Sequence, residues 1–399
     1  MAEIVVERAE YESRINRVRE ALVRDGFDGI LVVDPANLYY LTGYNAWSFY
    51  MPQALYVPVG GDVTLMMREM DAVGAHRTAV VGASWVLGYP ETYVHQQDRH
   101  PMTWCAEQLV ATHRILPGTR RIAYEGDAHF FSPRSFRAFA DAVTAAMPGI
   151  ELVDSHELVN WVRVVKSDTE IDIMRRAGVI ASEAMRVGIE AIDEGVSQAE
   201  LAALILAQQA RGVPGSEGDY PAIMPMLPIG EGADTPHLTW TGKPLVRNEG
   251  VSIELAGVYR RYHAPLARTV ALGTPSAELD RVAKVTVEGL QAALDAVRPG
   301  ATAADPVLAW ERVIAQHGLE KRSRLGYSVG VGYPPDWGEH TVSLRADDTT
   351  ELQENMTFHM IAGMWMIGYG YELSETIRVS ADGVEVLTDA PRRLIVRGA

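Results

Sequence analysis

A glutamate stands inside an otherwise apolar stretch in the second half of the sequence. Residues 251–257 read Val-Ser-Ile-Glu-Leu-Ala-Gly and predict a buried strand, in which Glu254 shares a face with Ser252 and Ala256. Moving a carboxylate out of water is costly unless it is paired, so this position predicts an ion pair, a metal ligand or a catalytic group. A solvated glutamate at a strand end is the alternative that this segment alone leaves open.

A histidine ahead of this strand is a second candidate for proton chemistry. His237 lies in the segment 235–240, which reads Thr-Pro-His-Leu-Thr-Trp. Histidine titrates near neutral pH and serves as a general acid or base in many enzymes. Taken by itself, His237 fits a capping or surface-loop histidine at least as well.

A third motif has the pattern of a serine nucleophile but lacks its context. Residues 326–330 match G-x-S-x-G, which requires a strand before it and a helix after it. The next residues, 331–335, end in Pro-Pro and cannot begin a regular helix. No Asp and His follow at convincing triad positions, so we expect a glycine-rich turn. The sequence also lacks G-x-x-x-x-G-K-[ST] and His-Glu-x-x-His.

The elements that must position these residues form two groups. Strand and helix patterns alternate over the first 150 residues, which predicts an α/β domain. In the second half, Ser167 and Glu170 form a capping-box pattern at the start of a long helix, and strands return late, as in an α+β layer. The expected helices are 11–25, 103–114, 133–146, 168–186, 197–211 and 276–297, and the expected strands are 29–33, 54–58, 63–67, 251–257, 266–272, 356–361 and 371–379.

Composition limits the classes of function. The chain has 399 residues, which favours two domains over one core, and its acidic excess of 16 charges disfavours binding to nucleic acid or to anionic membranes. The single Cys105 excludes an intrachain disulfide and a cysteine-rich metal site. No signal sequence and no stretch of about 18 apolar residues is found, so we expect a cytoplasmic protein.

Several segments together resemble the creatinase, aminopeptidase P and methionine aminopeptidase family. They are the segments around His237 and Glu254 and residues 161–167, 262–269 and 375–383. The resemblance implies an α+β chain with an N-terminal creatinase-like α/β domain at 1–160 and a pita-bread catalytic domain at 161–399. It also implies a homodimer in which the N-terminal domain of one subunit lies near the active site of its partner.

Metallopeptidases of this family hold two metal ions with two Asp, one His and two Glu, and this sequence departs from that set. The resemblance places the first Asp at Glu254 and the second at Pro265. It places the His at Tyr327, the first Glu at Ile361 and the last Glu at Ser374. One carboxylate among five positions does not suit a hard divalent pair, so we expect no metal and no other cofactor.

Creatinase is a metal-free member of the family, and the position of its catalytic histidine matches His237. Further strings at 39–50, 218–223, 326–340 and 356–359 resemble the metal-independent branch that opens the cyclic amidine of ectoine to N-acetyl-2,4-diaminobutyrate. The resemblance implies a small-molecule substrate, with His237 and Glu254 as catalytic residues and Glu254 acting either as a charge partner and base or as a covalent nucleophile. The implied substrate-binding residues are Tyr327, Glu372, Trp47, Tyr50, Trp240 and His340.

Three other functions remain open from the sequence. Creatine hydrolysis shares the expected chemistry, an Xaa-Pro aminopeptidase shares the fold but needs metal, and a pita-bread binding module needs no catalytic glutamate. The first two are separated by substrate and by metal dependence. The third is disfavoured because this acidic chain carries no basic extension.

Overall fold

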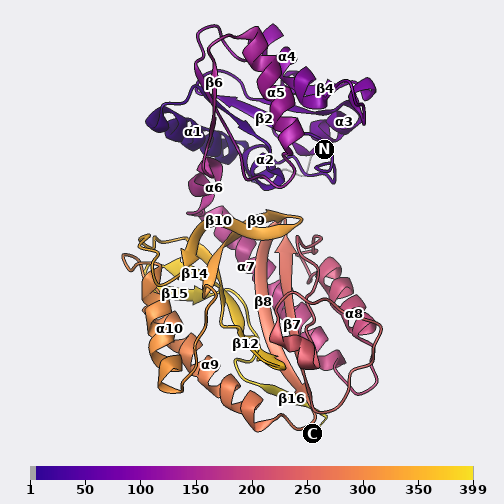
Figure 1. Cartoon of the computed structure of the whole chain (residues 1–399), viewed down its shortest axis with the longest axis vertical. Coiled ribbons are helices and arrows are strands. Elements are labelled where there is room, and N and C mark those ends of the chain that lie inside the picture. Colours follow the sequence, from indigo (N-terminus) through magenta and orange to yellow (C-terminus); the bar gives the residue numbers. More distant parts are fainter. Residues whose placement is uncertain (1–5, 399) are drawn as a thin grey trace. The chain divides into compact units, whose positions relative to one another are not determined.

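The computed structural model describes residues 6–398, and the chain divides into two compact units, Met1–Arg163 and Val164–Ala399 (Figure 1). The helix α6 (Leu158–Arg163) runs through residue 160, so the division falls after this helix. Across residues 6–398, no helix combines the length and the apolar character that a membrane crossing needs.

The N-terminal unit is built on a six-stranded mixed sheet with the order β4-β3-β2-β1-β5-β6. Strand β1 pairs antiparallel with β2 and parallel with β5. Its strands are β1 (Gly29–Val32), β2 (Ala54–Pro58), β3 (Thr64–Arg68), β4 (Val86–Tyr89), β5 (Arg121–Tyr124) and β6 (Glu151–Asp154). Its other helices are α1 (Arg8–Asp25), α2 (Pro35–Thr42), α3 (Glu69–Thr78), α4 (Pro101–Ala111) and α5 (Pro133–Ala146), with short 3₁₀ turns η1 (Ala83–Trp85) and η2 (Glu91–Tyr93).

The Asp34-Pro35 pair that ends the first strand also starts a helix that the sequence patterns did not predict. The Asp34 carboxylate accepts hydrogen bonds from the Ala36 and Asn37 backbone amides, and Pro35 occupies the first turn of α2. The buried Glu125 carboxylate accepts from the Val33 and Asp34 amides. The end of β1 is therefore fixed by two carboxylates.

The C-terminal unit is built on an eight-stranded sheet. Six strands have the order β15-β14-β11-β9-β8-β16, while β10 pairs with β9 and β7 pairs with β8. They are β7 (Glu249–Tyr259), β8 (Tyr262–Leu272), β9 (Gly326–Tyr333), β10 (Asp336–Leu344), β11 (Thr357–Ile361), β14 (Ser374–Ser380), β15 (Gly383–Val386) and β16 (Ile395–Arg397). A two-stranded hairpin, β12 (Met364–Met366) and β13 (Tyr369–Tyr371), precedes β14.

Two pairs of helices pack on this sheet. The pair α7 (Asp168–Ala191) and α8 (Gln198–Arg211) packs on β7 and β8, and the capping box of Ser167 and Glu170 is present at the start of α7. Gly257 lets β7 approach α7 closely, because a Cβ there would lie 2.1 Å from the Ala177 carbonyl oxygen. The second pair is α9 (Ala277–Ala296) and α10 (Ala304–Gln316), and a 3₁₀ turn η3 (Gly230–Asp234) precedes β7.

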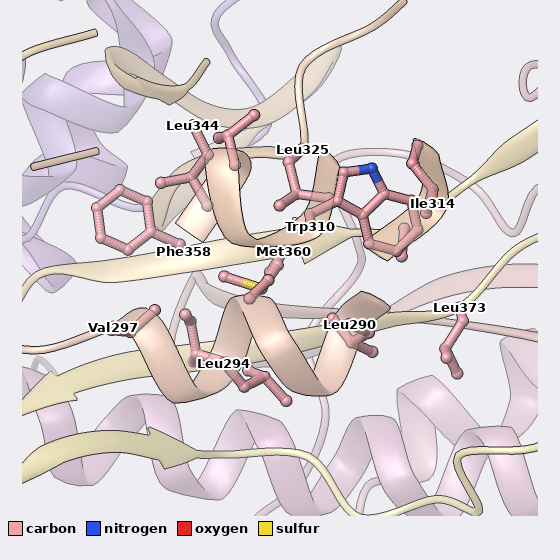
Figure 2. Close-up of a cluster of buried hydrophobic side chains, with 14 of the residues drawn as sticks. Leu290, Leu294, Val297, Trp310, Ile314, Leu325, Leu344, Phe358, Met360 and Leu373 are labelled. Atoms are coloured by element: carbon pink, nitrogen blue, oxygen red, sulfur yellow. The ribbon is translucent and has the colours of Figure 1, made fainter. Parts of the chain in front are cut away.

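The second helix pair encloses a core that fixes the orientation of β11. Figure 2 shows Leu290, Leu294 and Trp310 gathered with Phe358 and Met360, and all five are at most 2% exposed. Side chains alternate along a strand, so with Phe358 and Met360 in this core His359 faces the opposite side. The apolar packing thereby sets the direction of a polar side chain.

The G-x-S-x-G segment is part of strand β9, so the expected glycine-rich turn is wrong. Its glycines allow close contacts across the sheet: a Cβ on Gly326 would lie 2.4 Å from the His359 carbonyl oxygen, and one on Gly330 would collide with Glu339. The Ser328 hydroxyl shares a hydrogen bond with Thr341. The glycines of this motif are therefore explained by the close packing of β9 against its neighbouring strands.

Candidate functional site

The Glu254 carboxylate is buried on one face of β7, and its strand neighbours explain why. Ile253 and Leu255 point into the apolar cluster shared with α7 and α8, which leaves Glu254 on the opposite face with 7% of its surface exposed. On the same face, the Ser252 hydroxyl bonds to that of Thr269 at 2.9 Å. The solvated alternative for Glu254 is thus wrong.

A second buried carboxylate, Glu372, lies just before β14 and interacts with Glu254. The Trp365 Nε1 donates to Glu372 Oε1 at 2.8 Å, whereas Oε2 is buried without a hydrogen-bond partner among the described residues. Burial, reinforced by the neighbouring Glu372, raises the pKa of Glu254 to about 8. Burial also raises the pKa of Glu372 to about 7, against the opposing effects of Trp365 and Lys321.

Lys321 completes this electrostatic group, and sequence patterns missed it. Its ammonium donates to the Gly363 carbonyl at 2.8 Å and lies 4.3 Å from the centroid of the Trp365 ring. Burial lowers the pKa of Lys321 to about 7, while Glu372 opposes the shift. Lys321 stands in the charged run 320–324, which has the composition of a solvated surface and gave no local signal.

A chain of hydrogen bonds runs beside the two carboxylates. The Trp337 Nε1 donates to the Tyr327 hydroxyl at 2.8 Å, and that hydroxyl bonds to His359 Nδ1 at 3.1 Å. His359 Nε2 bonds to the Ser374 hydroxyl at 2.8 Å, and Ser374 also accepts the Ala267 backbone amide at 2.6 Å. The charge of Glu254 helps to raise the pKa of Tyr327, after burial itself.

The donor set of this site does not fit a pair of divalent metal ions. Glu254 is the one carboxylate at the five positions where the resemblance expects metal ligands, and Tyr327 and Ser374 are both hydrogen-bonded to His359. Within residues 6–398, no group of three or more His, Cys, Asp or Glu side chains has the geometry of a metal site. Hard cations prefer several carboxylate oxygens, which this arrangement does not provide.

The structure shows different local surroundings for the other predicted site residues. His237 is exposed and makes no hydrogen bond within the described part of the chain, and Trp240 packs against the apolar cluster of α7, α8 and β7. His340 is exposed and bonds to Asp336 at 2.8 Å. Trp47 and Tyr50 belong to the N-terminal unit, where they are 57% and 61% exposed. The structure thus brings together Glu254, Glu372 and Tyr327 and leaves the roles of the others as predictions.

The buried carboxylates should make the stability of the protein fall as the pH rises. The folded state holds the Glu254 proton more tightly than the unfolded state, in which the carboxyl has its ordinary pKa of 4.5. The stabilisation is complete below that pH and is lost as the pH rises through about 8. We expect Glu254→Gln to flatten this decline, measured by urea unfolding at pH values across this range.

A matched control separates Glu254 from other groups. Glu125, in the other unit, also has a pKa that burial raises to about 8, so the wild type and Glu254→Gln must be compared directly. Glu249→Gln changes the same functional group on the same strand and should keep the wild-type pH dependence. An equal slope in the wild type and in Glu254→Gln would contradict the prediction.

Two family models together match most of the chain. The model of metallopeptidase family M24 matches residues 172–381, and that of the creatinase/prolidase N-terminal domain matches residues 14–165. Among curated proteins, the chain is 38% identical to an ectoine hydrolase of Halomonas elongata over 98% of both chains. It is 22% identical to an Xaa-Pro dipeptidase of Pyrococcus furiosus over 96% of this chain and 100% of that one.

Solved structures share the fold at lower identity. A prolidase from Thermococcus sibiricus superposes with a TM-score of 0.83 at 21% identity, covering 97% of this chain and 99% of the other. The prolidase of Pyrococcus horikoshii gives 0.79 at 22% identity, with 96% and 100% covered. At this identity the likeness concerns the fold alone.

Proposed function

The chain belongs to metallopeptidase family M24, with a creatinase-type N-terminal domain and a pita-bread domain, and we propose that it hydrolyses the amidine ring of ectoine without a metal ion. The two family models and the likeness to solved prolidase structures confirm the predicted fold class. The proposal is supported by the 38% identity to an ectoine hydrolase over 98% of both chains. It also includes a homodimer, as the sequence resemblance implies, and the cytoplasmic location expected from the sequence.

The observation that carries the proposal is the buried pair of Glu254 and Glu372. Burial raises the pKa of Glu254 to about 8 and that of Glu372 to about 7, even with Lys321 near Glu372, so these carboxylates bind protons near neutral pH until a further cation enters. An amidinium ion supplies the missing positive charge over two nitrogen atoms and two N–H groups. The unpartnered Glu372 Oε2 offers an acceptor for one of them.

The same pair can carry out the hydrolysis. When the amidinium enters, Glu254 releases its proton to the solvent, and the resulting carboxylate takes a proton from a water molecule that attacks the amidine carbon. The carbon–nitrogen bond then breaks, and both protons of the water end on the departing nitrogen, the first returned by Glu254. The products are an amide and an ammonium group, so charge and atoms balance. Direct attack of Glu254 on the same carbon is the covalent alternative.

The decisive experiment is incubation of EDTA-treated protein with ectoine, followed by proton NMR of ring opening. We expect full turnover in protein whose metal content, measured by plasma mass spectrometry, is far below one ion per chain. Creatine and an Xaa-Pro dipeptide serve as matched substrates and should remain intact. Turnover that requires added Mn²⁺ or Zn²⁺, or cleavage of the dipeptide in place of ectoine, would contradict the proposal.

A further inference from the structure

His359 occupies a fully buried position between two hydroxyl groups, and the proposed mechanism has not used it. Its Nδ1 bonds to the Tyr327 hydroxyl and its Nε2 to the Ser374 hydroxyl, and the ring is 0% exposed. Burial lowers the pKa of His359 to about 3, aided by the Arg324 guanidinium, so the ring is neutral at working pH. A neutral imidazole has one N–H donor and one acceptor, which makes the two hydrogen bonds unequal.

Two arrangements of protons satisfy these bonds. In the first, Ser374 donates to Nε2, and the Nδ1–H donates to the Tyr327 oxygen. In the second, Tyr327 donates to Nδ1, and the Nε2–H donates to Ser374. Each arrangement leaves one hydroxyl proton without an acceptor inside the chain of bonds: that of Tyr327 in the first, that of Ser374 in the second.

Burial decides between the two arrangements. The Ser374 oxygen already accepts the Ala267 amide, and the residue is 0% exposed, so in the second arrangement its proton would be buried without a partner among the described residues. The Tyr327 hydroxyl already accepts the Trp337 N–H and lies within the influence of the Glu254 carboxylate, so its own proton, unlike that of Ser374, has a group outside the chain of bonds to serve. The first arrangement therefore has the lower free energy.

We propose that Ser374 holds His359 in its Nδ1–H form, so that the Tyr327 hydroxyl is kept as a hydrogen-bond donor to the substrate beside Glu254. This inference rests on the proposed function and adds two positioning residues to it, because His359 and Ser374 act through Tyr327. The phenol proton would serve an acceptor that develops in the reaction, either the attacking oxygen or the departing nitrogen. Tyr327 and Ser374 stand at positions where the resemblance expects metal ligands. In this proposal both act together through His359, without a metal ion.

The direct test is the tautomer of His359, which does not depend on turnover. Long-range proton–nitrogen NMR of protein labelled with ¹⁵N-histidine reports which ring nitrogen carries the proton, and His359→Gln identifies the signal. We expect Nδ1–H in the wild type and in Ser374→Thr, and a shift toward Nε2–H in Ser374→Ala. An Nε2–H form in the wild type overturns the proposal, whether or not the protein acts on ectoine.

A double-mutant cycle tests that the effect passes through Tyr327. Ser374→Ala should lower kcat for ectoine about tenfold, the effect of one lost hydrogen bond, and Ser374→Thr should restore it. In the Tyr327→Phe background, Ser374→Ala should cost nothing further. Independent, multiplying losses overturn the proposal, because a merely structural role of Ser374 would persist without the phenol. If the wild type fails to open ectoine, the proposed function fails while the NMR result still stands.

Discussion

Glu254→Gln is expected to lower the turnover of ectoine by about 10²- to 10⁴-fold, the usual contribution of a general base. The amide has the shape of the carboxylate but can neither accept the proton of the attacking water nor balance an amidinium charge. Because the substitution removes a carboxylate that costs free energy when ionised in the buried site, folding should not suffer. Initial rates measured by NMR, with circular dichroism of the same preparations, would show both effects.

Glu249→Gln on the same strand is the matched control and should turn over ectoine at the wild-type rate. A Glu254→Gln protein that is folded and retains more than about a tenth of the wild-type rate would remove Glu254 from its assigned role. Substrate binding gives a further distinction. We expect KM to rise as well, because Glu372 alone then faces the cation.

Glu375→Ala is expected to destabilise the C-terminal unit by about 3–5 kcal/mol, the usual cost of breaking a buried ion pair. The Glu375 carboxylate and the Arg268 guanidinium are both 0% exposed and lie 2.6 Å apart, and Arg392 also bonds to Glu375 at 2.9 Å. After substitution, Arg268 keeps backbone carbonyl partners but has lost its buried counter-ion. Urea unfolding followed by far-ultraviolet circular dichroism would measure the loss.

Glu354→Ala provides the comparison for a surface pair. Glu354 is 51% exposed and lies 3.3 Å from Arg378, so its removal should cost about 0–1 kcal/mol. If the two variants lose similar free energies of unfolding, the Arg268–Glu375 pair contributes no more than a solvent-screened surface pair, and the prediction is wrong.

Helices and strands were predicted correctly where interactions between neighbouring residues determine the local structure. The capping box at Ser167 predicted the start of α7, and the alternation around Glu254 predicted β7. The helices α2, α3 and α10 were not predicted. α2 has only eight residues, and α3 and α10 have no side-chain cap, so each carries little local signal. The G-x-S-x-G segment was predicted as a turn, but it is a strand. Its glycines are needed for close packing against strands that lie far away in the sequence, which local patterns do not show.

The candidate site was only partly visible in the sequence. Glu254 was conspicuous because a carboxylate breaks an apolar strand, and Glu372 followed from its alternation with Ser374. Lys321 lies in a run of charges, and no local property distinguishes it from an exposed lysine. The metallopeptidase ligand positions were found by resemblance, which indicated lost ligands without showing how the substituted side chains bond to one another.

By itself, the sequence determined the two-domain plan, the family and the presence of a carboxylate in an apolar strand. The domain plan and the carboxylate were visible in periodicity and composition, which reflect a few neighbouring residues, and the family was recognised by the resemblance of several segments. Only the tertiary structure decided that Glu254 and Glu372 share one buried site, and that Tyr327, His359 and Ser374 form one hydrogen-bonded chain. The pairing of distant strands brings these side chains together, and burial then sets their pKa values and leaves each proton few partners.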